Sequence, residues 1–426
     1  MTITLFLGTL LSCIAIRIPI AFALLVSSVV LMFHLDLFST QILAQNVVDG
    51  SDSYTLLAIP FFLIAGEVMA QGGLSRRIVN LAMAFVGHKK GGLGFVAIFA
   101  AMVMASLSGS AVADTAALAS MLLPMMRQAN YPVGRSAGLL AAGGIIAPIL
   151  PPSIPLILIG VAGGISITKL FLAGIVPGIL MGLALALTWS FLNRRENIAV
   201  AEKATWSMKL RALKESFWAL MLPIIIIGGI KTGIFTPTEA AVVAAVYALF
   251  ISTLVYRELG VKQLMDVVGK AARSTAIVMF LVAAAMVASW LISIAQIPMM
   301  VADLLSPFID SPRMLMFCMM LVILLVGTVM DLPPTILVLT PILMPLVKQA
   351  GIDPVYFGLM MALNCAIGLI TPPVGSVLSV ISSIGKVPYE KAVQGTAPFL
   401  LVYTTLLMLF VAFPEIITVP MGWMVG

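Results

Sequence analysis

Long apolar stretches fill this chain, and short polar or basic connections separate them. Several stretches reach the length of about 20 residues that a helix needs to cross a hydrocarbon core about 30 Å thick. Apolar helices are predicted over residues 1–33, 54–71, 168–192, 217–230, 240–256, 274–295 and 397–413. The first stretch is too long for a cleavable signal peptide and lacks its basic start, so it is predicted to be retained. The pattern predicts an all-α polytopic membrane protein.

The connections differ in charge, which indicates the side of the membrane on which each lies. Residues 34–53 contain aspartates but no lysine or arginine and are predicted to lie outside, whereas the strongly basic connection 193–215 is predicted to be cytoplasmic. Residues 74–86 combine a basic patch with an apolar face, which is typical of a helix in the membrane interface. Residues 257–273 form a second basic interfacial segment, and residues 298–310 a polar connection.

Interruptions of the apolar sequence recur at one spacing. Pro124 and Pro345 differ by 345 − 124 = 221 positions, and Pro151 and Pro372 by 372 − 151 = 221. In each group a small polar run with a carboxylate comes first, and a Pro-Pro pair follows. The runs are Ser106 to Ser110 with Asp114, and Gly327 to Asp331; the pairs are Pro151-Pro152 and Pro372-Pro373. The chain therefore contains an internal repeat.

Each polar run divides an apolar stretch into two short arms. The arms 91–107 and 111–126 have about 16 residues each, or about 24 Å of helix, against a core of about 30 Å. This length favours a re-entrant hairpin over the alternative of two ordinary short spans. The later prolines remove N–H donors and free several carbonyls, which predicts a broken helix. We predict two inverted structural repeats, each with a re-entrant helical hairpin and a broken transmembrane helix.

The composition excludes a soluble protein. Of the 426 residues, 62% are hydrophobic and 9% are charged, whereas a soluble domain carries roughly 25% charged residues. The length allows about eleven or twelve spans. The net charge of +6 is spread over the short connections, so it is explained by membrane topology and not by nucleic acid binding. The three scattered cysteines predict neither a disulfide framework nor a metal motif.

The two interruptions of each repeat are predicted to meet and form a sodium site. Sodium is a hard cation that favours carbonyl and hydroxyl oxygens. The predicted ligands of one site are Ser106, Ser108, Gly109, Ser110, Pro148 and Ile149, and those of the other are Gly327, Thr328, Ile370, Thr371 and Gly375. No organic cofactor and no catalytic residue is predicted.

An anionic substrate group is predicted to lie between the hairpin tips, where it faces helix N-termini. The predicted substrate contacts are Ser108, Ser110, Asp114, Pro151, Pro152, Ser153, Asp331, Pro372 and Pro373. A carboxylate at the centre of a membrane helix costs about 2.5 to 3.5 kcal/mol, so Asp114 and Asp331 require a reason. Capping of a helix N-terminus and direct binding are both open for them.

Two glutamates in apolar sequence have simpler interpretations. Glu67 is expected to pair with a basic residue, with proton carriage as the alternative. Glu239 follows Thr236-Pro237 at the spacing of a capping box and is predicted to be structural.

Several segments resemble the large membrane subunit of tripartite ATP-independent periplasmic (TRAP) transporters. They are IPFFLIAGEVM at 59–69, SLSGSAVADTAAL at 106–118, APILPPSIPLI at 147–157, TGIFTPTEAA at 232–241 and GLITPPVGSVL at 368–378. The resemblance implies an elevator-type, sodium-coupled carrier in the bacterial inner membrane, in which a scaffold holds a transport domain built from both hairpins. The transport halves are then expected at 91–165 and 312–385, with scaffold at 1–90 and 166–311 and a C-terminal helix at 386–426.

The resemblance also implies partners and a substrate class. A small membrane subunit of about four helices, expected here as a separate polypeptide, and a soluble periplasmic binding protein would complete the transporter. Sodium and not ATP would drive uptake of an acidic organic molecule, with sialic acid expected first and C4-dicarboxylates second.

Two other functions compete with a carrier. Asp114 and Asp331 could be the catalytic pair of an intramembrane aspartyl protease, although the Gly-x-Gly-Asp segment of that class is missing before Asp331. A channel could use the same broken helices to line a pore, and no feature of the sequence separates it from a carrier.

Overall fold

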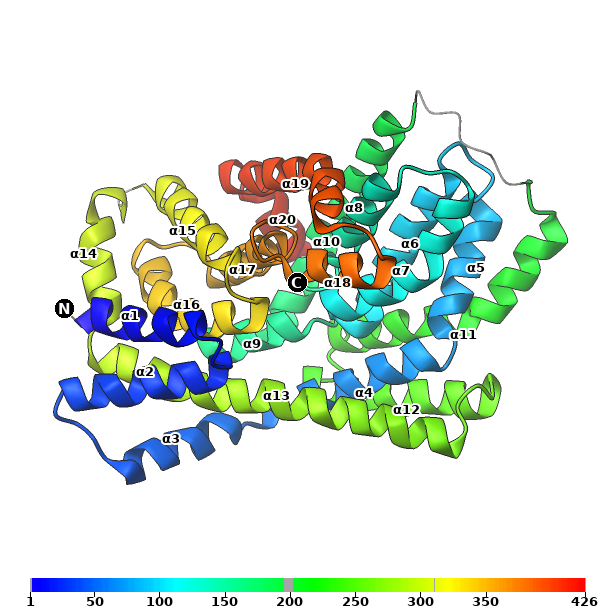
Figure 1. Cartoon of the computed structure of the whole chain (residues 1–426). Helices are drawn as coiled ribbons and strands as arrows, with labels where there is room; N and C mark the ends of the chain where they lie inside the picture. The colour runs from blue at the N-terminus through cyan, green and yellow to red at the C-terminus, as the bar shows by residue number, and fades with distance from the viewer. Residues whose placement is uncertain (1, 195–201, 310, 426) are drawn as a thin grey trace.

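The computed structural model describes residues 2–194, 202–309 and 311–425, and helices account for nearly all of them (Figure 1). The first half contains α1 (Thr2–Ala15), α2 (Ile20–His34), α3 (Thr40–Ser51), a 3-10 turn (Tyr54–Leu57), α4 (Ala58–Gln71), α5 (Leu74–Val86), α6 (Gly92–Ser108), α7 (Ala111–Gln128), α8 (Val133–Gly144), α9 (Ile154–Gly163) and α10 (Ile167–Leu192). The second half contains α11 (Trp206–Lys231), α12 (Pro237–Phe250) with a π-helical end (Ile251–Val255), α13 (Val261–Ile294), α14 (Ile297–Ile309), α15 (Pro312–Gly327), α16 (Leu332–Gln349), α17 (Pro354–Gly368), α18 (Ser376–Gly385), α19 (Tyr389–Ala412) and α20 (Glu415–Val425). The prediction of an all-α chain is confirmed.

The single helix predicted over residues 1–33 is wrong, because the structure has two helices there. Arg17 adopts a left-handed conformation with φ of +65°, and Pro19 directly precedes α2. A proline disfavours helical backbone at the residue before it, so the helix cannot continue through this point. The two helices α1 and α2 pack against each other.

The basic segments are more helical than predicted. The expected interfacial segment 257–273 and the expected span 274–295 merge into α13, which has 34 residues and no proline. At 1.5 Å per residue it is about 51 Å long and extends past a hydrocarbon core of about 30 Å. The connection 298–310 is also largely helical, as α14, and α11 begins at Trp206 instead of residue 217. Residues 195–201 of the basic connection lie outside the described residues.

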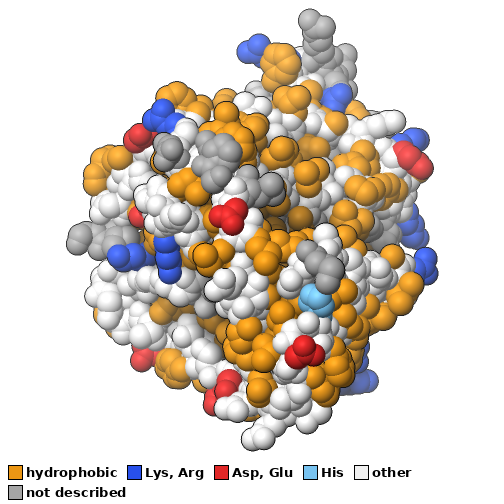
Figure 2. Space-filling view, turned by 90° about the vertical axis from the view of Figure 1, so that its left-hand side faces the viewer, with side chains coloured by type: hydrophobic (Ala, Val, Ile, Leu, Met, Phe, Trp, Pro, Cys, Tyr) orange, Lys and Arg blue, Asp and Glu red, His pale blue; other side chains and the backbone are white. Residues whose placement is uncertain are grey.

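Seven helices of the described residues are long and apolar enough to cross a membrane, and further apolar helices are shorter. The sequence length suggested more spans, but the breaks at Pro19 and at the Pro-Pro pairs divide apolar stretches into shorter helices. Hydrophobic side chains cover much of the face seen in Figure 2, where charged side chains are scattered. Exposed apolar residues of α1 and α2 include Leu11, Phe22 and Phe33. An apolar surface of this extent is suited to contact with lipid or a membrane partner.

The repeat found in the sequence is visible in the helix bounds. The starts of α7 and α16 differ by 332 − 111 = 221 residues, and their ends by 349 − 128 = 221. The starts of α8 and α17 differ by 354 − 133 = 221, and those of α9 and α18 by 376 − 154 = 222. Each repeat therefore has the same order, which is a helical hairpin followed by a helix broken in two.

Two groups of helices pack together. In the first group, α13 packs on α2, α3 and α4, and α12 packs on α4, along the lower side of the molecule in Figure 1. The second group contains both hairpins (α6–α7 and α15–α16), both broken helices, α10 and α19. Within it the repeats exchange contacts, because α9 packs on α16 and α18 packs on α7. This exchange joins the two repeats into one body.

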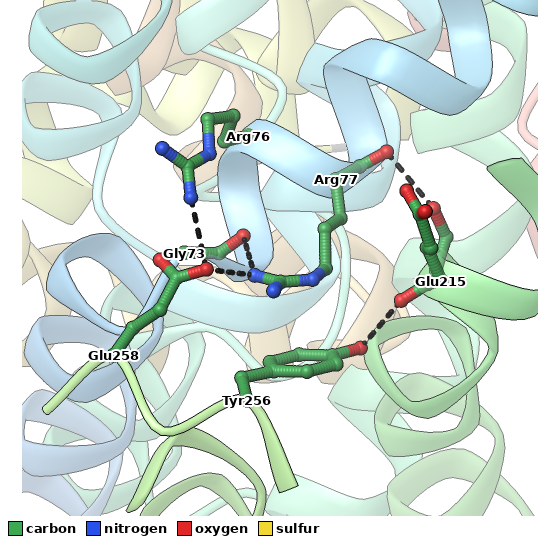
Figure 3. Close-up of polar contacts among 7 residues, drawn as sticks. Gly73, Arg76, Arg77, Glu215, Tyr256 and Glu258 are labelled. Atoms are coloured by element: carbon green, nitrogen blue, oxygen red, sulfur yellow. Dashed lines mark hydrogen bonds and ion pairs between the residues drawn. The ribbon is translucent and has the colours of Figure 1, made fainter.

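A polar cluster holds the N-terminal end of α5 (Figure 3). Arg77 Nη1 lies 2.6 Å from Glu258 Oε1 and 3.0 Å from the carbonyl oxygen of Gly73. The guanidinium carbon of Arg77 lies 3.6 Å from the centroid of the Tyr256 ring. Tyr256 donates a hydrogen bond of 2.8 Å to the carbonyl of Glu215 in α11. The cluster therefore ties α5 to α11 and to the turn that follows α12.

Candidate functional site

The tip of the first hairpin is a short loop closed by its own serines. Gly109 adopts φ of +62° between α6 and α7, a conformation that glycine reaches without steric cost. Ser108 Oγ accepts a hydrogen bond of 3.1 Å from the Ser110 N–H and donates one of 2.5 Å to Asp114 Oδ1. Ser110 Oγ accepts from the Ala113 N–H at 3.4 Å and caps α7. The sequence Ser-Gly-Ser thus forms the turn and the cap together.

The break in the first repeat lies directly beside this tip. The irregular residues between α8 and α9 are buried throughout, and Ser153 caps α9 while its Oγ donates a 2.6 Å hydrogen bond to the Pro148 carbonyl. A Cβ atom placed on Gly109 would lie 2.7 Å from the carbonyl oxygen of Pro152. Irregular backbone at this depth is tolerated because protein surrounds it.

The second repeat brings its own tip and break together. Asp331 caps α16 by accepting a 3.0 Å hydrogen bond from the Leu332 N–H, and Ser376 at the start of α18 donates one of 3.2 Å to the same carboxylate oxygen. A Cβ atom on Gly368 would lie 2.6 Å from the carbonyl oxygen of Gly327. The tip therefore contacts the backbone of the broken helix, as in the first repeat.

The two breaks differ in exposure. Leu150 in the first break is 7% exposed, whereas Val374 in the second is 49% exposed, and Pro372 and Pro373 beside it are exposed as well. Asp331, Pro333 and Pro334 line a cavity of about 750 Å³ whose other walls are apolar residues of α2 and α13 and Pro19. The second tip and break are thus open in this structure, and the first break is closed.

The two aspartates are not equivalent. At the repeat offset of 221, Asp331 corresponds to Ser110 (331 − 110 = 221) and Asp114 to Thr335 (335 − 114 = 221). Asp331 is exposed and serves as a helix cap. Asp114 is 3% exposed, and its Oδ2 has no hydrogen-bond partner among the described residues. Capping accounts for Asp331 but not for Asp114.

Several predicted ligands already donate hydrogen bonds to backbone carbonyls three or four residues before them. The hydroxyls of Ser106, Thr328 and Thr371 donate to the carbonyls of Val103, Leu325 and Ile367 at 2.7, 2.8 and 2.8 Å. The carbonyl of Ile149 packs against Gly174 of α10, whereas the Pro152 carbonyl faces the tip. A hydroxyl that donates a hydrogen bond keeps both oxygen lone pairs, and a carbonyl oxygen that accepts one keeps a second, so these contacts alone do not prevent cation binding.

A cavity of about 270 Å³ lies between the first hairpin tip and the first helix group. Ser108, Ser110 and Asp114 of the hairpin line it together with Glu67 of α4. A Cβ atom on Gly66 would lie 3.5 Å from Ser108 Cα, so α4 approaches the tip at van der Waals distance. The expected ion pair of Glu67 is absent among the described residues. Glu67 was not predicted to belong to the site, because only the fold brings it to the tip.

Comparison with known proteins supplies the family. The profile of the DctM component of tripartite ATP-independent periplasmic transporters matches residues 7–416. The 2,3-diketo-L-gulonate TRAP transporter large permease protein YiaN of Escherichia coli is 58% identical over 423 residues, which cover 99% of this chain and 100% of YiaN. The sialic acid TRAP transporter large permease protein SiaM of Vibrio cholerae is 38% identical, covering 93% of each chain.

The fold has a solved counterpart. The crystal structure of the YdaH transporter of Alcanivorax borkumensis superposes with a TM-score of 0.62, at 15% identity and over 87% of each chain. At this identity the likeness concerns the fold alone.

Proposed function

Because this chain belongs to the DctM family, the large permeases of tripartite ATP-independent periplasmic transporters, we propose that it carries a small acidic organic solute into the cell in symport with sodium. A tripartite system also contains a small membrane subunit and a periplasmic binding protein. We propose that the small subunit is a separate four-helix polypeptide, that the complex lies in the bacterial inner membrane, and that the connection 193–215 is cytoplasmic.

The chain is a transporter permease and not an enzyme, so the aspartyl protease interpretation is wrong. The positions of the two aspartates agree with this. Asp331 caps α16 and lines the cavity at the second tip, while Asp114 lines the cavity at the first tip.

The substrate proposed first is 2,3-diketo-L-gulonate. The relative that carries this name, YiaN, is 58% identical along 99% of this chain, whereas the sialic acid permease SiaM is 38% identical. This order differs from the sequence expectation, in which sialic acid came first and C4-dicarboxylates second. All three are acidic organic molecules, so the substrate class is unchanged.

The observation that carries the sodium proposal is the contact of each hairpin tip with the break of its own repeat. Gly109 meets the Pro152 carbonyl, and the Gly327 carbonyl meets Gly368. Each contact gathers backbone carbonyls and hydroxyls, the oxygen ligands that a hard cation prefers. The predicted sodium ligands and substrate contacts stay as proposed, and the Pro152 carbonyl joins the first sodium site.

The helix packing supports a division into two bodies, which meet where α13 packs on α16. The exchanged contacts α9 to α16 and α18 to α7 tie the hairpins and broken helices together, and α10 and α19 pack on α8 and α17. We therefore assign α10 and α19 to the moving transport domain, and α2, α3, α4, α12 and α13 to the scaffold. For α10 this proposal departs from the sequence expectation, which placed residues 166–311 in the scaffold. In this proposal the repeats are inverted, the hairpins are re-entrant and transport follows an elevator mechanism.

Uptake into proteoliposomes tests the proposal. The chain is reconstituted with its small subunit, the binding protein is added outside, and labelled 2,3-diketo-L-gulonate, sialic acid or a C4-dicarboxylate is supplied. Accumulation is compared under an inward sodium gradient, an inward potassium gradient and ATP. We expect accumulation with sodium and the binding protein only. Equal flux without a gradient or without the binding protein would indicate a channel and would overturn the symport assignment.

A further inference from the structure

The cavity at the first hairpin tip joins two parts of the molecule that the proposed function sets in relative motion. Asp114 and Ser108 belong to hairpin 1, and Glu67 belongs to α4 of the scaffold. A Cβ atom placed on Gly66 would lie 3.5 Å from Ser108 Cα. This close approach of α4 to the tip places the next residue, Glu67, beside it. Ser75 of α5 and Ser274 of α13 add two hydroxyls to the cavity wall.

The described residues that line this cavity do not balance its negative charge. Among the described residues, neither lysine, arginine nor histidine lines it, and the two charged residues that do are both carboxylates. Asp114 is 97% buried (100 − 3); Ser108 binds its Oδ1, and its Oδ2 is buried without a partner in the described part of the chain. A buried carboxylate oxygen with no partner is costly, and two carboxylates facing one cavity increase that cost.

The basic residues of α13, the helix that adds Ser274 to the cavity wall, do not supply the missing partner. Lys270 of α13 interacts electrostatically with Glu67, but its Nζ is held 2.8 Å from Asp266 Oδ2. Lys270 and Arg273 of this helix are both exposed. On the other helices that line the cavity, Arg76 and Arg77 of α5 are engaged by Glu258. A ligand from outside the chain is therefore the group that fits.

We propose that Glu67 and Asp114 bind a hard metal cation in this cavity, assisted by the serine hydroxyls, and that the cation bridges the scaffold and hairpin 1. The donors are carboxylate and hydroxyl oxygens, the set that a cation such as sodium prefers. This inference rests on the proposed function, which supplies sodium as the ion. It adds a site beyond the two tip–break sites, which lie wholly within the transport domain.

The position of the two carboxylates gives this site a conformational role. One cation can contact both only while the tip of hairpin 1 lies against α4, so binding favours the present arrangement over any in which the hairpin has moved away. The cation must leave before the transport domain moves. Sodium bound here therefore holds the first tip against α4, whereas sodium at the tip–break sites travels with the substrate.

Thermal unfolding of the purified full-length chain tests this site. The midpoint is measured against sodium concentration, with choline chloride keeping the ionic strength constant, for the wild type, E67Q and the control E202Q. Glu202 is exposed in the connection before α11, so E202Q changes the same charge without touching the cavity. We expect the half-saturating sodium concentration to rise about tenfold in E67Q, equivalent to about 1.4 kcal/mol, and to be unchanged in E202Q.

Sodium-driven uptake by the same variants separates this inference from the proposed function. E67Q should still couple uptake to sodium, at a higher half-saturating sodium concentration. E67D keeps the carboxylate, so it should restore part of the sodium affinity. It also replaces E67Q in both measurements if E67Q does not fold. Wild-type sodium dependence of both unfolding and uptake in E67Q would overturn the cation site and leave the symport intact. Uptake by the wild type that does not depend on sodium would overturn the proposed function.

Discussion

At the scale of single residues, identical side chains take different roles because their neighbours differ. Asp331 stands at the first position before α16 and accepts the Leu332 N–H, as expected for a helix cap. Asp114 lies one turn inside α7, where Ser110 already caps the helix. Its carboxylate is therefore available for a ligand. The contrast shows why the residue type alone left both roles open.

Two features favour glycine at position 109: its left-handed backbone and the close approach of a neighbouring carbonyl. Gly164 has only the first feature and therefore serves as a control. Both have φ of +62°, but an added Cβ meets the Pro152 carbonyl at 2.7 Å only at Gly109, and nothing within 4 Å at Gly164. Left-handed backbone costs an alanine about 1 to 2 kcal/mol at either position. We expect G164A to lower stability by this amount and to retain uptake, and G109A to lose most uptake as well. Thermal unfolding and proteoliposome uptake measure the two effects; equal uptake by both variants would contradict a functional contact at the tip.

Arg76 and Arg77 approach the same carboxylate oxygen of Glu258, at 2.9 and 2.6 Å, but their side chains are 63% and 18% exposed. Charged hydrogen bonds that are sheltered from water contribute about 1.5 to 3 kcal/mol, and exposed pairs about 0 to 1 kcal/mol. We expect R77Q to lower the free energy of unfolding by the larger amount and R76Q by the smaller. Denaturant unfolding in detergent tests this, and equal losses would show that the cluster does not anchor α5.

At the scale of elements, helices approach closely where glycines face each other. A Cβ atom on Gly395 of α19 would overlap the Gly134 carbonyl of α8, and one on Gly138 would overlap Gly395 itself. Small residues are the usual means of bringing membrane helices this close. This crossing connects the helix before the first break to the long helix that follows the second repeat, and so supports the body that carries both tips.

The crossing predicts that G395A is strongly destabilising, by about 1 to 3 kcal/mol or more, because the methyl group forces the helix backbones apart. G228A in α11 is the matched control, since nothing lies within 4 Å of its added Cβ. There alanine should be neutral or stabilising by up to about 1 kcal/mol, as expected for glycine to alanine in a helix. Unfolding of the two variants under the same conditions tests the difference; a G395A midpoint at or above that of G228A would refute the close crossing.

At the scale of the whole molecule, the two repeats have the same order of elements but not the same environment. The first break is sealed by surrounding helices, and the second carries exposed Pro372, Pro373 and Val374. The two repeats therefore differ in how far their breaks are exposed within one conformation.

This asymmetry can be measured by thiol labelling. In a background in which Cys13, Cys318 and Cys365 are replaced, V374C should react readily with a water-soluble maleimide. L150C should react at least tenfold more slowly, a lower bound of about 1.4 kcal/mol for the opening that exposes it. Labelling in sodium-free proteoliposomes is compared with labelling after denaturation, which shows that both thiols are reactive once exposed. Comparable native rates would mean that the first break is also open.

Local interactions of the sequence determined much of this protein. The apolar stretches predicted the all-α fold, since a membrane requires backbone hydrogen bonds to be satisfied within each helix. The predicted interfacial segment 74–86 has the bounds of α5, the repeat offset of 221 reappears in α7 and α16, and the capping box of Thr236 and Glu239 is present. Each depends on residues within a few turns of one another, or on a pattern visible along the chain.

Only the tertiary structure decided which distant residues meet. Glu67 reaches the cavity of Asp114 because α4 passes the hairpin tip, and Ser376 reaches Asp331 across 45 positions. The exchange of α9 and α18 between repeats has no signature in the sequence, since an apolar helix face fits more than one neighbour. Helix formation is local, but the choice of neighbours follows from packing the whole chain at once, and that packing assembles the site.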